Sequence, residues 1–222
     1  PCLVQKKWDG ERLLIRNGEF LSRSMKPIRN QWLKDRLTEI LDFESGLLPK
    51  NLDGEIQIDG DFQSTQGFLQ SSNREGAFIY HVFDSTVTED SPFSTRHAIA
   101  QGAVTAINHP QIQIVPYVEV ETMAELMELH MENVSNPSLD GTITRNPTSG
   151  YKRGRSTVKE GHAMKIKEFD DDEGKIIGFT ERMHNTNEAQ TNELGRTFRS
   201  SAQEGLEPTG LLATYIVEWN GV

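Results

Sequence analysis

The sequence predicts a mixed domain of helices and strands, of the α/β or α+β class. Short runs of alternating apolar residues recur along the chain, and amphipathic segments of helical period lie between them. Turn-forming and capping residues stand at the junctions. This alternation is typical of sheets covered by helices, rather than of an all-helical or an all-strand domain.

The first elements are a hairpin and a capped helix. Residues 12–16 and 19–22 flank Asn17 and Gly18, a strong signal for a two-residue hairpin turn. Asn30 then predicts a helix start, because its side chain can accept from a free backbone N–H of the first turn. The apolar positions of this helix follow helical spacing: Trp32, Leu33, Leu37, Ile40 and Leu41.

The middle of the chain continues the alternation. Residues 52–58 and the aromatic-rich residues 78–83 predict strands. A helix is expected from Ser94 to Ile107, ended by a His-Pro pair. Residues 112–120 predict one further strand.

A second capped helix follows. Thr122 and Glu125 form a capping box for a helix reaching about Val134. Short strands are expected around Ile143 and over residues 164–167. The helix carries methionines at i, i+4 spacing, which favours packing against the core over a binding surface: Met123, Met127 and Met131.

The character of the sequence changes after Lys167, so we place a domain boundary near residue 168. Domains are therefore expected over residues 1–167 and 168–222, the second rich in strands. Residues 183–209 are polar and almost free of aliphatic side chains. By composition alone such a segment is more often a disordered loop than a functional arm.

Charge is distributed unevenly along the chain. The formal net charge of −10 argues against a nucleic-acid ligand, because phosphate neutralisation needs Lys and Arg. By region, however, residues 1–50 carry +3 and residues 141–167 carry +6, against −12 for 51–140 and −7 for 168–222. This pattern is compatible with one basic surface on an acidic body.

Composition excludes several classes of protein. No apolar run approaches 18 residues, so no membrane contact is expected. The N-terminal sequence lacks the regions of a signal peptide. The single cysteine, Cys2, excludes a disulfide framework and any zinc site built on several cysteines. We therefore expect an intracellular protein that is not secreted.

The sharpest chemical signal is the motif KxDGxR, which runs from Lys7 to Arg12. A lysine amine is a nucleophile only when neutral, and nearby cations or desolvation lower its pKa. Gly10 allows close backbone approach, Asp9 can orient the amine, and Arg12 can bind an oxyanion or a sugar. The alternative is a surface hairpin with a solvated lysine.

With further motifs in order, the chain resembles the covalent nucleotidyltransferases, specifically the small ATP-dependent DNA ligases of the Chlorella virus type. The resemblance covers nearly the whole chain. After the nucleophile motif, the matching segments are Ser22–Ser24 with Lys26–Asn30, Asp53–Glu55, Phe83-Asp84, Asp140-Gly141 with Tyr151–Thr157, and Lys165–Lys167.

The resemblance implies the fold and the chemistry of the nucleotide site. Residues 1–167 would form an adenylyltransferase domain of antiparallel, ATP-grasp-like sheets with flanking helices. Lys7 would attack the ATP α-phosphate and hold AMP. Lys165 and Lys167 would contact that phosphate, Glu55 would bind the ribose and Phe83 would stack on adenine.

The resemblance also implies the partners. AMP would pass to the 5′-phosphate of nicked duplex DNA, and the neighbouring 3′-OH would then seal the strand. Arg23 and Arg155 would hold the 5′-phosphate, and Arg12 the nucleotide sugar or the DNA end. Mg²⁺ is expected, with Asp140 and Glu55 as oxygen donors. The chain would act as a monomer, in host cytoplasm or nucleus if it is viral.

Residues 168–222 resemble the first strands of an OB-fold β-barrel, and residues 183–209 a β-hairpin latch that encircles DNA. The residues expected to contact DNA there are Arg196, Phe198 and Arg199. Because the rest of the barrel and the family's sixth motif lie outside the sequence, we expect weak self-adenylation.

One residue departs from the family pattern. Asp140 stands where the family usually has Glu. This retracts the carboxylate by roughly 1.5 Å, a shift large enough to impair a metal-assisted step. Three other functions stay open at this point: an RNA ligase, an mRNA-capping guanylyltransferase and a catalytically impaired nick-binding protein. The latch-like insert and residues 151–157 favour the DNA ligase.

Overall fold

The structure is a computed structural model that describes residues 1–41, 51–59, 62–169, 171–191 and 197–219. It divides into two compact units, Pro1–Glu168 and Phe169–Val222. The first unit contains two sheets and the helices that cover them. The described part of the second unit contains strands and one short 3₁₀ helix.

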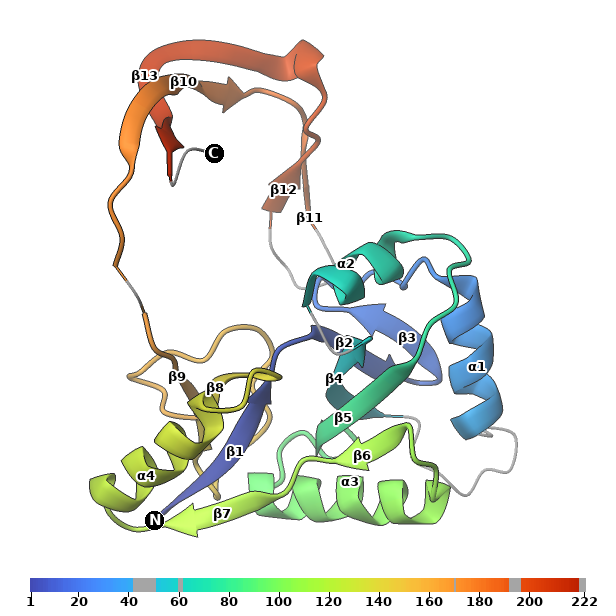
Figure 1. Cartoon of the computed structure of the whole chain (residues 1–222). Coiled ribbons are helices and arrows are strands. Elements are labelled where there is room, and N and C mark those ends of the chain that lie inside the picture. The colour runs from blue at the N-terminus through green and yellow to red at the C-terminus, as the bar shows by residue number, and fades with distance from the viewer. Residues whose placement is uncertain (42–50, 60–61, 170, 192–196, 220–222) are drawn as a thin grey trace. The chain divides into compact units, whose positions relative to one another are not determined.

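The first sheet has four antiparallel strands in the order β7-β1-β8-β9 (Figure 1). Helix α4, Met123–Val134, packs on it, and Leu126 of this helix forms a small apolar cluster with Val4 and Val120. The strands are β1 (Cys2–Trp8), β7 (Tyr117–Val120), β8 (Leu139–Arg145) and β9 (Ala163–Ile166).

The second sheet has five strands in the order β3-β2-β4-β5-β6, antiparallel except for the β5–β6 pair. Helix α3 connects β5 to β6 and packs against both, as a parallel pair requires a crossover connection. The elements are β2 (Glu11–Arg16), β3 (Glu19–Ser22), α1 (Gln31–Leu41), β4 (Leu52–Ile58), α2 (Phe62–Gln70), β5 (Phe78–Ser85), α3 (Phe93–Ile107) and β6 (Ile112–Ile114).

The main core lies between this second sheet and its helices. Leu33 and Leu37 of α1 are fully buried there, as the helical spacing predicts. Trp32 packs on the same core with its ring edge-on to Phe68 and Phe78. Side chains of this kind supply most of the stability of such a unit, at about 1.5–3 kcal/mol for each fully buried large apolar residue.

Three local predictions are confirmed. Asn17 and Gly18 both have positive φ, of 53° and 85°, which is the geometry of a tight hairpin between β2 and β3. Asn30 accepts the backbone N–H of Leu33 at 2.8 Å and so caps α1. Thr122 and Glu125 form the capping box of α4.

The prediction of one strand over residues 112–120 is wrong. The chain forms β6 in the second sheet, leaves it at Val115 and Pro116, and forms β7 in the first sheet. Pro116 lacks the N–H that a continuing ladder would use, so the ladder ends there. The alternating pattern could not reveal this, because both strands are apolar on one face.

The expected packing of the methionine stripe on α4 is also wrong. Met123, Met127 and Met131 are 70%, 41% and 57% exposed, because Leu126 and His130 make the buried face of this helix instead. Helix α2 was not predicted at all. Its sequence is rich in Gln, Ser and Gly, which weakens the helical signal.

The second unit consists of two antiparallel strand pairs within the residues described. Strand β10 (Lys175–Asn185) pairs with β13 (Leu206–Glu218), and β11 (Ala189–Thr191) pairs with β12 (Thr197–Arg199). A 3₁₀ helix spans Gln203–Gly205. The β11–β12 pair lies inside the polar segment 183–209.

None of the helices in the described ranges is both long and apolar enough to cross a membrane.

Candidate active site

Lys7 stands at the end of β1, where the pairing with β8 changes register between Lys6 and Trp8. The side chain of Lys7 forms an ion pair with Asp140 of β8, and Lys167 pairs with the same carboxylate oxygen. All three side chains are about one quarter exposed, at 22–27%. The structure thus brings together three residues that the sequence proposes as catalytic.

The carboxylate of Asp140 is held in its ionised form. Partial burial acts to raise its pKa, but the hydrogen bonds from Lys167 and Lys7 outweigh burial and lower the pKa below its usual value. One negative charge therefore lies between two ammonium groups. A polyphosphate could replace the carboxylate at these lysines, since its oxygens offer the same kind of acceptor.

Two glycines of the motifs are required by close backbone approach. A Cβ at Gly10 would collide with the carbonyl oxygen of Ile56, and one at Gly141 with that of Ile166. Gly141 also has a φ of +109°, which side-chain-bearing residues rarely adopt. The two glycines let the chain segments of Lys7 and Asp140 lie directly against their neighbouring strands.

Glu55 lies on β4 between its cross-strand neighbours Arg12 and His81. Burial raises the pKa of Glu55 to about 8, against the opposing effect of the charge on Lys7. At neutral pH the carboxyl is therefore largely protonated and can donate as well as accept a hydrogen bond. Such a group suits the hydroxyls of a sugar.

Phe83 lies on β5 and is half buried. The guanidinium of Arg145 lies over its ring, 5.1 Å from the centroid. This contact is a cation–π interaction. The half-buried ring thus borders a polar cluster rather than lying wholly within the apolar core.

Arg12 is engaged by a carboxylate and a phenol. It donates to Asp53 through Nε at 2.9 Å and Nη2 at 2.5 Å, and Nη2 also donates to the Tyr151 hydroxyl at 2.8 Å. That hydroxyl in turn donates to Asp53 at 2.8 Å. Burial opposes the charge of Arg12, but the ion pair with Asp53 raises its pKa above the usual value.

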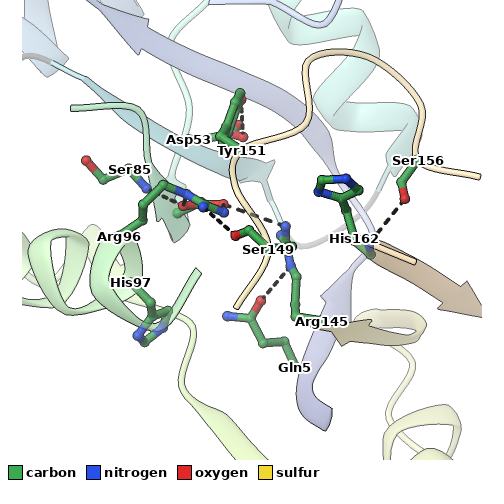
Figure 2. A network of polar contacts seen from close by, with 12 residues as sticks. Gln5, Asp53, Ser85, Arg96, His97, Arg145, Ser149, Tyr151, Ser156 and His162 are labelled. Carbon is green, nitrogen blue, oxygen red and sulfur yellow. Dashed lines mark hydrogen bonds and ion pairs between the residues drawn. The ribbon is translucent and has the colours of Figure 1, made fainter. Parts of the chain in front are cut away.

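A second buried network links the two sheets (Figure 2). Arg96 of α3 donates to both carboxylate oxygens of Asp84, at 2.9 and 3.1 Å, and Arg145 of β8 lies 3.7 Å from the same carboxylate. Arg145 also donates to Gln5 of β1 at 3.2 Å. These contacts hold β1 and β8 beside β5, and so support the strand that carries Lys7.

Sequence reasoning missed Arg96, Arg145 and Tyr151 as individual residues. One signal could have found Arg96: it is one of only two Lys or Arg residues in the acidic stretch 51–140, and its helix carries no other Lys, Arg, Asp or Glu. At 2% exposure, such an arginine needs a buried carboxylate partner.

The remaining predicted residues are spread over the chain. Lys165 is exposed on β9, opposite Ile143 of β8. Asp9 follows β1 and its N–H donates to the carbonyl of Ser138 at 3.2 Å. Arg23 and Arg155 are exposed on loops of the first unit.

In the second unit, Phe198 is 42% exposed on β12, and Arg199 beside it donates to the carbonyl of Asn187. The predicted DNA contact Arg196 lies outside the described residues.

The described residues contain no group of three His, Cys, Asp or Glu side chains that could hold a metal ion. Mg²⁺ is often held by only one or two carboxylates together with substrate phosphates. The ionised carboxylate of Asp140 fits this role, whereas the raised pKa of Glu55 makes it a poorer ligand.

Comparison with known proteins assigns the unit that carries this site to a known family. Residues 1–167 match the family described as ATP dependent DNA ligase domain. The crystal structure of Chlorella virus DNA ligase-adenylate is 30% identical, with a TM-score of 0.65, over 100% of this chain and 74% of that one. No curated protein sequence matches the chain.

Two more distant structures share the fold. The structure of a Lig E DNA ligase is 22% identical over 89% of this chain and 76% of that one, with a TM-score of 0.64. The ATP-dependent DNA ligase from bacteriophage T7, in complex with ATP, is 19% identical over 90% of this chain and 74% of that one, with a TM-score of 0.57.

Proposed function

Because the chain belongs to the ATP-dependent DNA ligase family, we propose that Lys7 is the nucleophile that ATP adenylates in the first step of nick sealing. The antiparallel sheets and flanking helices are those of the ligase structures, and the activity is that of an ATP-dependent DNA ligase. The observation that carries the role of Lys7 is its ion pair with Asp140, which Lys167 shares.

In the first step, Nζ of Lys7 forms a bond to the α-phosphorus of ATP, and the bond from that phosphorus to the pyrophosphate oxygen breaks. The amine must first lose a proton, and Asp140, ionised and in contact with Nζ, is the group placed to accept it. Lys167 then faces the negative charge that develops on the transferred phosphate. Positioning and charge neutralisation are the main sources of rate in such transfers.

Later steps move the AMP to DNA. The 5′-phosphate at a nick displaces Lys7 from the phosphorus, and the adjacent 3′-OH then displaces AMP and closes the strand. Arg23 and Arg155 are exposed, and we propose that they hold the 5′-phosphate through charge-assisted contacts. Arg12 is proposed to contact the sugar or the DNA end. Its guanidinium already donates to Asp53 and Tyr151, so it would make this contact in addition to those bonds.

Glu55, Phe83 and Lys165 are proposed to recognise the nucleotide. The protonated carboxyl of Glu55 binds the ribose hydroxyls, and the half-buried ring of Phe83 stacks on adenine. Lys165 contacts the α-phosphate from β9. Asp9 orients the Lys7 segment through its backbone bond to Ser138.

Bound Mg²⁺ would neutralise phosphate charge and polarise the α-phosphorus. Asp140 would hold it, with Glu55 as the weaker candidate.

Nicked duplex DNA is the proposed macromolecular partner. Phe198 and Arg199 of the β11–β12 hairpin would contact the duplex, together with Arg196. We propose a monomer that acts inside the cell.

The decisive experiment incubates the chain with α-labelled ATP or GTP and Mg²⁺, and separates the products by denaturing electrophoresis. Lys7→Ala is the control. A label from ATP that requires Lys7, and sealing of a DNA nick, support the proposal. A label from GTP indicates a capping enzyme, sealing of an RNA nick alone an RNA ligase, and nick binding without label an impaired binding protein.

A further inference from the structure

Gln57 of β4 joins the two sheets beside Lys7. Its side-chain nitrogen donates to the carbonyl oxygens of Asp9 and Ser138, each at 3.1 Å. Asp9 follows Lys7 by two residues, and Ser138 precedes Asp140 by two. One buried amide, 6% exposed, therefore holds both chain segments that carry the central ion pair.

The backbone alone leaves this junction weakly held. Pairing of β1 with β8 is interrupted between Lys6 and Trp8, resumes at Trp8 and Leu139, and ends with the bond from Asp9 N–H to Ser138 at 3.2 Å. The carbonyl of Asp9 lies past this last backbone bond, and the carbonyl of Ser138 accepts it and can accept a second bond. A planar amide with two hydrogens supplies a donor to both at once.

His81 of β5 completes the arrangement. Its Nε2 lies 3.3 Å from the side-chain oxygen of Gln57. Because the nitrogen of Gln57 faces two carbonyls, its oxygen must accept, so Nε2 of His81 carries the hydrogen. The His81 ring also stacks on Trp8, with centroids 3.7 Å apart and planes 7° from parallel.

We propose that Gln57 is a positioning residue for Lys7, acting through the carbonyls of Asp9 and Ser138 to keep the nucleophile opposite Asp140 during adenylation. The inference rests on the proposed role of Lys7. Gln57 makes no bond to the side chains of the nucleotide site that the structure describes, so it acts on geometry rather than on nucleotide affinity. A displacement of about 1 Å at a reacting group can cost about a hundredfold in rate.

The test compares Gln57→Glu and Gln57→Met with the parent chain. Both keep the length of the side chain and remove the two donors. Formation of labelled protein from α-labelled ATP is followed at increasing ATP. We expect the maximal rate to fall about tenfold or more, while the ATP concentration for half-maximal rate changes less than about twofold.

Gln111→Glu is the matched control. Gln111 also donates a side-chain hydrogen bond to a backbone carbonyl of the second sheet, that of Phe78 at 3.3 Å. It directly precedes β6, the edge strand of that sheet, and so lies away from the junction held by Gln57. It should label at the parental rate. Gln57 variants that label at the parental maximal rate, or that lose rate only through ATP affinity, would overturn the positioning role.

A second measurement does not depend on labelling. Hydrogen exchange over residues 7–11 and 137–141 should quicken in the Gln57 variants and stay parental in Gln111→Glu. Unchanged protection overturns the inference. If Gln57→Glu fails to fold, Gln57→Asn serves instead, since its amide is shorter by roughly 1.5 Å and cannot reach both carbonyls.

The two proposals fail differently. A parent chain that takes no label overturns the proposed function and, with it, the catalytic meaning of Gln57. A parent that labels through Lys7 while the Gln57 variants match it overturns the positioning role alone.

Discussion

Lys7 and Asp140 are 133 residues apart in the chain and form an ion pair where β1 and β8 change register. The irregular pairing brings the two side chains opposite each other, and Gly141 allows β9 to approach from the other side. A regular ladder would keep the backbone bonds but lose this geometry. The pair is therefore a product of how the first sheet is built.

Asp140→Asn should lower the rate of Lys7 adenylation by about tenfold to a hundredfold, because the variant keeps the shape of the side chain but removes the proton acceptor. The rate is measured by single-turnover labelling with ATP and Mg²⁺. Asp35→Asn, on the exposed face of α1, is the control for loss of one negative charge. A parental rate in Asp140→Asn would exclude Asp140 from the step.

Asp140→Glu should raise the adenylation rate above that of the parent chain. The Glu side chain is the one that the family usually has, and it extends the carboxylate by roughly 1.5 Å. This should correct the shift that impairs the metal-assisted step. Labelling at a series of Mg²⁺ concentrations checks this. A rate equal to or below the parental rate would mean that this chain is adapted to the shorter side chain.

Tyr151→Phe should lower the free energy of unfolding by about 1–3 kcal/mol, because the hydroxyl bonds both Arg12 and Asp53 inside the first unit. Urea unfolding provides the measurement. Tyr117→Phe is the matched control, since no hydrogen bond of the Tyr117 hydroxyl is found among the described residues. Equal stability of the two variants would show that the hydroxyl network contributes little.

The stability of the protein should depend on pH through His81. Burial lowers the pKa of His81 to about 4, whereas the unfolded chain takes up this proton near pH 6.5. Between these values the unfolded state binds more protons, so the contribution of His81 to stability falls as pH drops from about 6.5 to 4. The full effect is on the order of 3 kcal/mol.

The check on this prediction is the difference in unfolding free energy between the parent chain and His81→Phe, measured from pH 4 to pH 7. Phe keeps an aromatic ring for the stack on Trp8 but does not titrate. Subtracting the two curves removes other groups such as Glu55, whose raised pKa acts in the opposite direction over the same range. A difference that does not vary with pH would contradict the assignment.

The β11–β12 hairpin offers a clean deletion. Thr186 and Gly205 are joined at its base by a backbone bond of 2.8 Å, so residues 187–204 can be replaced by a short linker. Removal should weaken the binding of nicked duplex, because it takes away Phe198 and Arg199, while labelling of Lys7 by ATP continues. Nick affinity measured by gel shift that equals the parental value would reject the latch role.

Much of the local structure was predictable because its causes lie close together in the chain. The hairpin at Asn17 and Gly18 follows from turn chemistry, and the helix starts at Asn30 and Thr122 follow from capping. The order of the motifs around Lys7 likewise identified the family. Residues 112–120 show the limit, since an apolar alternation does not reveal that its two halves enter different sheets.

By itself, then, the sequence determined the family, and it predicted the nucleophile and the residue types around it. Only the tertiary structure decided which side chains meet. Gln57 contacts carbonyls 48 and 81 residues away, and Arg96 reaches its carboxylate across a helix–sheet interface. Contacts of this kind depend on the packing of two sheets and on the irregular pairing of β1 with β8, neither of which has a local signature in the chain.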